Sequence, residues 1–260
     1  MEFGLSELAV IPIRQGLSDR SEMLSQILFG ESFEIIAKRG EWLRIKMPED
    51  NYEGWVVKDA VSIISENDFL RLQNNKKVFF EDLQTVLIRN NNDKILVPIG
   101  SVFPNFKQGE SVFTINNNHY KFEKSIGEEV VTVDKREMII NIAKKLLNCP
   151  YLWGGRTAWG IDCSGFTQLL YRIAGVNIPR DSNQQVHFGN TINFTTDAKS
   201  GDLIFFDDDE GNIVHVGVYM GSGQIIHAST KVRIDIVDHQ GIYNREIKRY
   251  THNLRVIKSI

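Results

Sequence analysis

The sequence lacks the long apolar runs and the excess of one charge that mark membrane proteins and nucleic-acid-binding proteins. No stretch approaches the roughly 20 consecutive apolar residues of a membrane span. The formal net charge is only −3, so we expect neither nucleic acid nor a membrane as a partner. No basic segment followed by an apolar one opens the chain. A signal peptide is therefore not predicted, and we expect a cytoplasmic protein if Met1 is the natural start.

Cysteine is also scarce, since the 260 residues contain two, Cys149 and Cys163. Two cysteines are too few for a disulfide framework, and a cytoplasmic chain keeps both reduced. The roles that remain are packing, metal binding and catalysis. Cys149 lies in NCPY, where no neighbouring residue indicates a catalytic or metal-binding role, and we interpret it as structural.

What is present is an ordinary globular composition, 42% hydrophobic and 24% charged, arranged in three sections. Residues 1–64 contain short β segments with regular turn signals and predict a small all-β barrel. Residues 65–131 carry weaker β segments, with turn-like asparagine runs at 90–92 and 116–118, and predict a second small β domain. Residues 132–260 begin with helical spacing and continue as apolar runs separated by turns. This pattern predicts an α+β domain with an antiparallel sheet.

The stretch GIDCSGF contains the cysteine of greater chemical interest. Asp162 is a good N-cap, and the apolar stripe that follows ends at Gly175, so Cys163 is predicted to lie in the first turn of a helix. The free amides and the positive end of the helix dipole favour a thiolate, which is the attacking species. A lone cysteine is more often a buried small residue. The helix start and the Gly-rich loop before it favour a nucleophile instead.

A nucleophilic cysteine needs a base, and His215 and His227 are the best candidates. Gly221–Gly223 lies midway between them, so a hairpin would bring the two histidines within about one position of facing each other. One imidazole would activate the thiol, while the second would accept its other N–H and fix its tautomer. We expect the other histidines to be surface residues or satisfied core residues: His119, His187, His239 and His252.

Four blocks of the sequence resemble the NlpC-type family of cell-wall cysteine peptidases. These blocks are YLWGGRTAWGIDCSGF, IPRDSNQQ, GDLIFF, and HVGVYMG with IIHAS, and they occur in the family's order over about residues 134–260. The resemblance implies a papain-like catalytic domain over residues 132–260 that needs neither a metal nor a cofactor. In that domain Cys163 would be the nucleophile, His215 the general base and His227 the third, orienting member.

The N-terminal section resembles the bacterial SH3-like barrel that precedes this domain in murein-peptide hydrolases, and KILVPIGSVFPNF is similar to a second, divergent SH3-like barrel. The resemblance implies a monomer that cleaves between γ-D-Glu and an L-diamino acid in small murein peptides and releases L-Ala-D-Glu. It implies that six residues line the substrate subsites: Glu22, Tyr52, Tyr151, Asp162, Ser164 and Ser182. A carboxylate, Asp162 or Glu22, would pair with the free ammonium of L-Ala, and Tyr52 would close the cleft behind it.

The residues leave other functions open. A thiolate and two imidazoles would also suit zinc with an open position, so Cys163, His215 and His227 could form a metal hydrolase site. The barrels could instead bind peptidoglycan beside an inactive catalytic domain. A thiol amidase or acyltransferase would use the same covalent intermediate. The sequence does not distinguish diaminopimelate from lysine as the third residue of the substrate.

Overall fold

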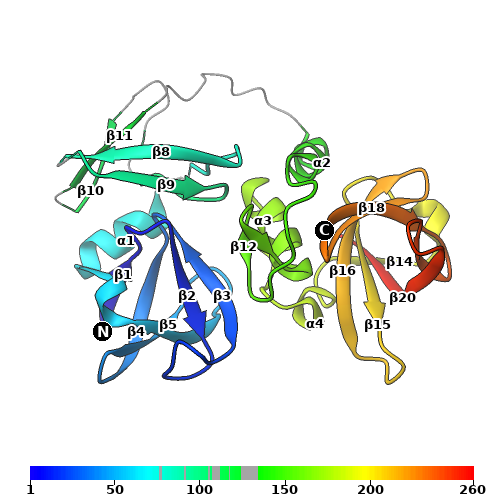
Figure 1. Cartoon of the computed structure of the whole chain (residues 1–260), viewed down its shortest axis with the longest axis horizontal. Helices are drawn as coiled ribbons and strands as arrows, with labels where there is room; N and C mark the ends of the chain where they lie inside the picture. The colour runs from blue at the N-terminus through cyan, green and yellow to red at the C-terminus, as the bar shows by residue number, and fades with distance from the viewer. Residues whose placement is uncertain (76–77, 91, 105, 107–111, 117, 124–133) are drawn as a thin grey trace. The chain divides into compact units, whose positions relative to one another are not determined.

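The chain divides into two compact units, Met1–Thr132 and Val133–Ile260, in a computed structural model (Figure 1). The structure describes residues 1–75, 78–90, 92–104, 106, 112–116, 118–123 and 134–260. The predicted boundary between residues 131 and 132 therefore lies outside the described residues. Within the described part of the chain, no helix is long and apolar enough to cross a membrane.

The first section of the N-terminal unit is an antiparallel sheet of seven strands in the order β3-β2-β6-β5-β4-β1-β7. Burial alternates along β2 and β5, so one face of the sheet packs into a core while the other meets solvent. The strands are β1 (Glu2–Leu5), β2 (Val10–Arg14), β3 (Met23–Leu28), β4 (Ser32–Arg39), β5 (Trp42–Lys46), β6 (Glu53–Val57) and β7 (Ser62–Ile64), with the 3₁₀ helix η1 (Lys58–Ala60) before β7. The predicted short β segments are confirmed, but the sequence pattern did not indicate β1.

The second section begins with a helix, α1 (Glu66–Asn74), that the sequence pattern did not predict. Ser65 caps it, because its Oγ accepts from the Asp68 amide at 3.1 Å. A four-stranded sheet follows in the order β10-β11-β8-β9. Its strands are β8 (Gln84–Arg89), β9 (Lys94–Pro98), β10 (Val112–Ile115) and β11 (Asn118–Phe122). Asn92 and Asn116 have φ of 67° and 50°, as expected for turn residues, while residues 91 and 117 of the two asparagine runs lie outside the described residues.

The two sections of the N-terminal unit share one hydrophobic core. Phe29 from the end of β3 packs edge-on against Tyr120 and Phe113 from the second sheet, with ring centroids 5.3 and 6.4 Å apart. Phe3 of β1 and Phe69 of α1 belong to the same buried cluster and stack at 4.3 Å. Because neither sheet buries its aromatic face alone, each section depends on the other for part of its stability.

The C-terminal unit combines helices with a sheet of seven strands in the order β14-β20-β15-β16-β17-β18-β19. The strand β19 also pairs with β20, so six of the strands close into a barrel. The helices are α2 (Lys135–Lys145), α3 (Cys163–Ile173), α4 (Ser182–Gln185) and the 3₁₀ helix η2 (Thr195–Asp197). The strands are β12 (Arg156–Thr157), β13 (Gly160–Ile161), β14 (Asn190–Ile192), β15 (Leu203–Asp207), β16 (Ile213–Gly221), β17 (Gln224–Ser229), β18 (Lys231–Val237), β19 (Gly241–Asn244) and β20 (Arg249–Ser259). The antiparallel sheet was predicted, and its closure was not.

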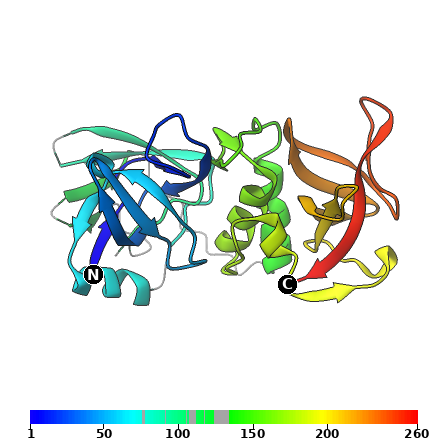
Figure 2. The ribbon, with the colours of Figure 1, turned by 90° about the horizontal axis from the view of Figure 1, so that it is seen from below.

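The helix α3 is the centre of this unit, because every residue from Cys163 to Ile173 is buried. It packs on β16 and β17 and also contacts α2 and α4. In Figure 2 the helices of this unit (green) lie to one side of its strands (yellow to red). A helix enclosed in this way has little freedom to shift, so the residue at its first turn is held in a fixed position.

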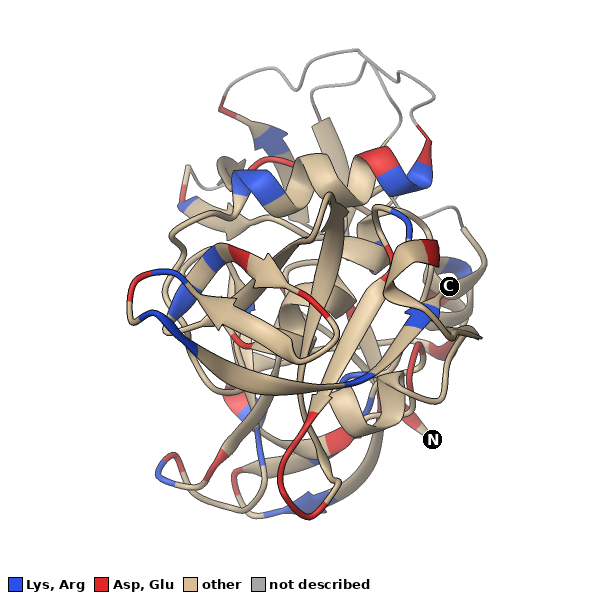
Figure 3. Ribbon diagram, turned by 90° about the vertical axis from the view of Figure 1, so that its right-hand side faces the viewer, with Lys and Arg blue, Asp and Glu red and all other residues tan. Residues whose placement is uncertain are grey.

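Charged residues of both signs are interspersed along the ribbon, with Lys and Arg in blue and Asp and Glu in red (Figure 3). The acidic run that begins at Asp207 forms a tight turn between β15 and β16. In this turn the carboxylate of Asp208 accepts from the amides of Glu210 and Asn212 at 3.0 and 2.9 Å. The acidic run is thus a turn stabilised by its own hydrogen bonds.

Candidate active site

Cys163 is the first residue of α3, and Asp162 is the N-cap, as the sequence predicted. The Oδ1 of Asp162 accepts from the amide of Gly165 at 2.7 Å. The cysteine is 8% exposed. The cap therefore fixes the turn that carries the thiol and satisfies one of the free amides of the helix start.

The Gly-rich loop before α3 has glycines because backbone there packs directly on backbone. A Cβ on Gly155 would lie 2.3 Å from the carbonyl oxygen of Gly160, and a Cβ on Gly165 would lie 2.3 Å from the carbonyl oxygen of Gly155. The amide of Gly154 donates to Oδ2 of Asp162 at 2.8 Å. The glycines thus let the loop fold tightly against the start of the nucleophile helix.

Asp162 also forms a buried ion pair with Arg180, which the sequence analysis did not identify. The Nη1 and Nη2 atoms of Arg180 donate to the two carboxylate oxygens at 3.0 and 2.6 Å. Arg180 is 1% exposed, and its Nη1 also donates to Oγ of Ser164 at 2.8 Å. Both oxygens of Asp162 therefore have partners within the protein. In this structure Asp162 is a cap and a counter-ion, and its pairing with a substrate ammonium stays a prediction.

His215 and His227 lie on the two strands of a hairpin, β16 and β17. The connecting residues Ser222 and Gly223 have φ of 52° and 69°, which is typical of a type I′ turn. The Nε2 of His215 lies 2.8 Å from the Nδ1 of His227. The two imidazoles therefore meet, as the sequence predicted, and both are buried.

The predicted strand register of this pair was wrong. The register shifts between Tyr219 and Gly221, and beyond the shift Val218 pairs with Ile226. The next position along β16, Gly217, therefore lies beside His227. A Cβ on Gly217 would be only 2.8 Å from the Cβ of His227. His215 is two residues further along its strand, so the imidazoles meet on a diagonal across a residue with no side chain.

Burial opposes ionisation of the Cys163 thiol, in the direction opposite to the helix start that favours a thiolate. Burial raises the pKa of Cys163 to about 12, and the negative charge of Asp162 adds to the effect. Hydrogen bonds from the backbone at Val216 and Ser164 act in the opposite direction but are outweighed. Burial also lowers the pKa of His215 well below its usual range. Both shifts favour the neutral forms of the thiol and the imidazole.

The hydrogen bond to Val216 also locates the nucleophile relative to the base. Val216 follows His215 on β16, so the thiol lies against the backbone of the strand that carries His215. The Nε2 of His215 is engaged with His227, which leaves Nδ1 as the ring nitrogen available to the thiol. The predicted nucleophile, base and orienting histidine thus come from α3, β16 and β17.

Three further residues surround the histidine pair, and the sequence analysis missed all of them. Asp235 on β18 contacts Nε2 of His227 at 3.2 Å, and Arg233 on the same strand donates to Asp235 at 2.7 Å. His252 on β20 stacks on His215, with ring centroids 4.2 Å apart. The sequence analysis expected His252 to be a surface or satisfied core residue and did not indicate its contact with His215. His252 is far from Cys163 in the sequence, so no local pattern indicated that it lies beside His215.

The remaining substrate-binding candidates are distributed over both units. Burial raises the pKa of the Tyr151 hydroxyl, and the nearby Cys163 and Asp162 raise it further, so Tyr151 adjoins the nucleophile. Ser182 is the first residue of α4. Glu22 and Tyr52 belong to the N-terminal unit. For Ser182, Glu22 and Tyr52 a role in substrate binding stays a prediction.

The metal-site alternative receives no support from the arrangement of the side chains. The Nε2 of His215 and the Nδ1 of His227 are engaged with each other at 2.8 Å. Across the residues that the structure describes, no group of three His, Cys, Asp or Glu side chains is arranged to hold a metal ion.

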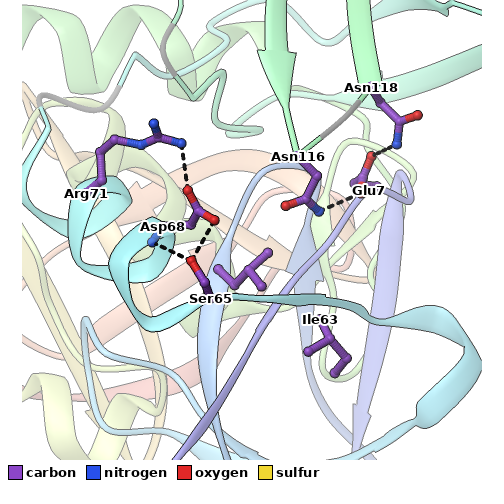
Figure 4. A pocket seen from close by; sticks show the side chains of 8 residues that line it. Glu7, Ile63, Ser65, Asp68, Arg71, Asn116 and Asn118 are labelled. Atoms are coloured by element: carbon purple, nitrogen blue, oxygen red, sulfur yellow. Dashed lines mark hydrogen bonds and ion pairs between the residues drawn. The ribbon is translucent and has the colours of Figure 1, made fainter.

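The N-terminal unit contains a polar pocket of its own (Figure 4). Its charged groups have partners within the protein. Glu7 accepts from Asn116 at 3.2 Å and from Asn118 at 2.7 Å, while Asp68 accepts from Arg71 at 2.8 Å. Glu7 also accepts from the hydroxyl of the buried Tyr120. This network links the first and second sections of the unit, so its evident role is structural.

The buried cysteine at a helix start, with an imidazole pair held by a β hairpin, defines a thiol hydrolase. Comparison with protein families agrees. The model of the NlpC/P60 family matches residues 148–255, and the model of the bacterial dipeptidyl-peptidase SH3 domain matches residues 13–61.

Similar proteins match over most of the chain. A γ-D-glutamyl-L-lysine dipeptidyl-peptidase of Bacillus subtilis (strain 168) is 30% identical over 256 residues, which are 90% of this chain and 82% of the relative. A protein of the same name from Bacillus cereus is 27% identical over 232 residues, 82% of this chain and 69% of the relative. A crystal structure of an NlpC/P60 family protein from Bacillus cereus ATCC 10987 has the same fold, with a TM-score of 0.82 at 19% identity and 99% of each chain covered.

The chain belongs to the NlpC/P60 family, and its N-terminal unit carries a bacterial SH3-like domain. It is a peptidase of this family, which confirms the resemblance that the four sequence blocks indicated. The fold is mostly β with few helices and includes a closed β-barrel.

Proposed function

We propose that the protein is a cysteine peptidase that hydrolyses the bond between γ-D-Glu and an L-diamino acid in small murein peptides with a free N-terminal L-Ala. One observation carries the proposal: the thiol of Cys163 lies at a helix start beside β16, where His215 is hydrogen-bonded to His227. Two relatives that match most of the chain are named γ-D-glutamyl-L-lysine dipeptidyl-peptidases, which supports this substrate class.

The first chemical step forms a thioester. The Nδ1 of His215 takes the proton of the Cys163 thiol while the sulfur attacks the γ-carbonyl carbon of D-Glu. The backbone N–H of Cys163 and the hydroxyl of Tyr151 are the candidate donors for the oxyanion. The imidazolium of His215 then gives its proton to the departing amine of the diamino acid, and the carbon–nitrogen bond breaks. L-Ala-γ-D-Glu remains attached to the sulfur.

The second step restores the enzyme. The neutral His215 accepts a proton from a water molecule as the water oxygen attacks the thioester carbonyl. The tetrahedral intermediate collapses, the carbon–sulfur bond breaks, and the sulfur recovers the proton from His215. L-Ala-D-Glu leaves as the free acid. Burial suits this sequence, because a neutral thiol and a neutral imidazole exist in the dry site without a charge penalty.

The free amine of L-Ala is the proposed basis of specificity. A carboxylate partner would compensate the buried ammonium, and the two oxygens of Asp162 already accept from Arg180 in the free protein. Asp162 and Glu22 are the candidate partners, and Tyr52 would close the cleft behind L-Ala. An acylated amine would lose the ionic hydrogen bonds and would add bulk at a closed end.

The finer architecture is part of the same proposal. We propose a papain-like α+β catalytic domain at residues 132–260, preceded by SH3-like barrels at residues 1–64 and 65–131, in a protein that acts as a monomer. The first barrel would contribute Glu22 and Tyr52 to the pocket, and Ser164 and Ser182 would contact the peptide. Size-exclusion chromatography with light scattering tests the oligomeric state.

One assay with matched arms tests the function. The free tripeptides L-Ala-γ-D-Glu-L-Lys and L-Ala-γ-D-Glu-diaminopimelate should each be assayed for release of L-Ala-D-Glu. We expect release by the wild type and by Cys149→Ala, no release by Cys163→Ala, and no cleavage of the N-acetylated tripeptides. Equal cleavage of the acetylated peptides would reject free-amine selection while leaving the peptidase. Transfer to an added amine would instead indicate an acyltransferase, and loss of activity with a chelator would indicate a metal enzyme.

A further inference from the structure

Behind the histidine pair, a buried carboxylate joins the last imidazole to an arginine. The Oδ2 of Asp235 lies 3.2 Å from Nε2 of His227. The Nε and Nη2 of Arg233 donate to the two oxygens of Asp235 at 2.7 and 3.1 Å. Asp235 is 2% exposed. The register pairs His227 with Arg233 and Ile225 with Asp235, so the three polar side chains lie on one face of the sheet.

The hydrogen-bonding capacity of these groups determines where each proton lies. An ionised carboxylate only accepts, and a guanidinium only donates. The pKa of Asp235 is held at about 2, because hydrogen bonds from His227 and Arg233 outweigh the effect of burial, which would raise it. Asp235 is therefore an acceptor throughout the neutral range. The hydrogen that joins Asp235 to His227 must reside on Nε2 of His227.

The same reasoning extends along the pair to the nucleophile. Burial lowers the pKa of His227, so its imidazole is neutral and carries one hydrogen. With that hydrogen on Nε2, the Nδ1 of His227 can only accept, and Nε2 of His215 must donate across the 2.8 Å contact. His215 then has no hydrogen on Nδ1. Nδ1 of His215 then has a free electron pair, which can accept the proton of the Cys163 thiol.

We propose that Asp235, held in place by Arg233, is a positioning residue that sets the tautomer of both histidines and so makes His215 competent as the base for Cys163. Asp235 contacts His227 and Arg233 and would act through His227. The inference rests on the proposed thiol-peptidase function for its activity readout. The proton positions themselves can be measured without substrate.

Arg233 has a second partner set that keeps it in place when Asp235 is changed. Its Nη1 pairs with Glu246 at 3.1 Å, and its Nη2 donates to Asn244 at 3.1 Å. In Asp235→Leu the guanidinium would be the polar group nearest to His227, and it can only donate. It would donate to Nε2 of His227 and move the hydrogen of that ring to Nδ1. His215 would then accept at Nε2 and carry its hydrogen on Nδ1.

The first test is kinetic and uses the whole chain. For Asp235→Leu we expect kcat to fall by about 10³- to 10⁴-fold with KM changed little, since a wrong histidine tautomer costs about 10⁴-fold in the Ser-His-Asp triad. Asp238→Asn, an exposed partner of Tyr250, is the matched control and should stay within about 2-fold of the wild type, as expected for a surface change.

The double variant Arg233→Leu with Asp235→Leu separates positioning from a structural role. Removal of the donor frees His227 to return to the productive tautomer, so we expect kcat to recover at least about tenfold relative to Asp235→Leu, a gain of about 1.4 kcal/mol. A structural ion pair predicts no recovery, because both variants would lack the pair.

Long-range ¹H–¹⁵N correlation of the ring nitrogens measures the tautomers directly in the Cys163→Ala background. We expect hydrogens on Nε2 of both histidines, and on Nδ1 of both once Asp235→Leu is added. A wild-type kcat for Asp235→Leu, no recovery in the double variant, or a hydrogen on Nδ1 of His227 with Asp235 intact would each overturn the proposal. Predicted tautomers in a protein that does not cleave the tripeptide would reject the peptidase function alone. The spectrum with Asp235 intact remains decisive even if Asp235→Leu does not fold.

Discussion

The Nε2 of His215 lies 2.8 Å from the Nδ1 of His227 although the strand register places Gly217, and not His215, beside His227. The imidazole of His215 therefore reaches diagonally across a residue that has no side chain. A Cβ on Gly217 would be 2.8 Å from the Cβ of His227 and 2.8 Å from Cδ1 of Ile225. The contact between base and orienting residue thus depends on a glycine that carries no chemistry.

Gly217→Ala should therefore impair catalysis. The added methyl group would push His227 away from His215, and a displacement of about 1 Å in a catalytic group can cost about 100-fold in rate. The measurement is kcat for release of L-Ala-D-Glu. Gly16→Ala is the control, since the nearest atom to a Cβ at Gly16 is 3.7 Å away. Unchanged kcat for Gly217→Ala would show that the histidine contact is not sensitive to this spacing.

The thiol of Cys163 should be unreactive at neutral pH in the absence of substrate. Burial raises its pKa to about 12, so the reactive thiolate becomes abundant only as the pH rises toward that value. Iodoacetamide modification of Cys163 followed by mass spectrometry in Cys149→Ala should therefore accelerate continuously above pH 9. A rate that already reaches its plateau near pH 6 would indicate a thiolate–imidazolium pair in the resting enzyme.

Loss of Arg180 should destabilise the C-terminal unit. Arg180→Ala would leave the buried carboxylate of Asp162 without its counter-ion, and breaking one side of a buried pair costs about 3–5 kcal/mol. Arg44→Ala is the matched control, because Arg44 forms a comparable 2.9 Å pair with Glu53 at the surface, where such pairs contribute about 0–1 kcal/mol. Equilibrium urea unfolding measures both. Equal losses of unfolding free energy in Arg180→Ala and Arg44→Ala would contradict the expected difference between a buried and a surface ion pair.

The ring of His252 should support catalysis by holding the imidazole of His215 in place. It stacks on His215 at 4.2 Å, and aromatic contacts of this kind contribute about 0.5–1.5 kcal/mol. His252→Ala should lower kcat by about 2- to 10-fold, since the ring of His215 gains freedom to rotate. His252→Phe should stay close to the wild type because it retains a stacked ring. If His252→Phe is as damaging as His252→Ala, the imidazole nitrogens of His252 take part directly.

Much of the active site could be predicted from the sequence because its determinants are local. Asp162 capping a helix that starts at Cys163 is a matter of neighbouring residues. The hairpin that brings His215 and His227 together also follows from nearby residues, with its turn at Ser222 and Gly223. The family blocks lie along the same short segments. Helix caps and tight turns can therefore be predicted from neighbouring residues without knowledge of the rest of the fold.

The parts that could not be predicted depend on residues brought together by the tertiary structure. The bulge that shifts the register by Tyr219 has no clear sequence signal, so the diagonal contact of the histidines was missed. Arg180 is distant in sequence from the carboxylate it pairs with, and His252 reaches His215 only because β20 closes the sheet with β19 and β15.

By itself, the sequence determined the helix that begins at Cys163 and the histidine hairpin, because helix caps, tight turns and residue types act over a few neighbouring positions. Only the tertiary structure shows the burial of Cys163. Every residue of α3 is buried, and this burial raises the pKa of the thiol, an effect opposite to that of the helix start. The tertiary structure likewise placed Asp235 behind His227, where strand pairing, and not proximity in sequence, brings the carboxylate to the imidazole.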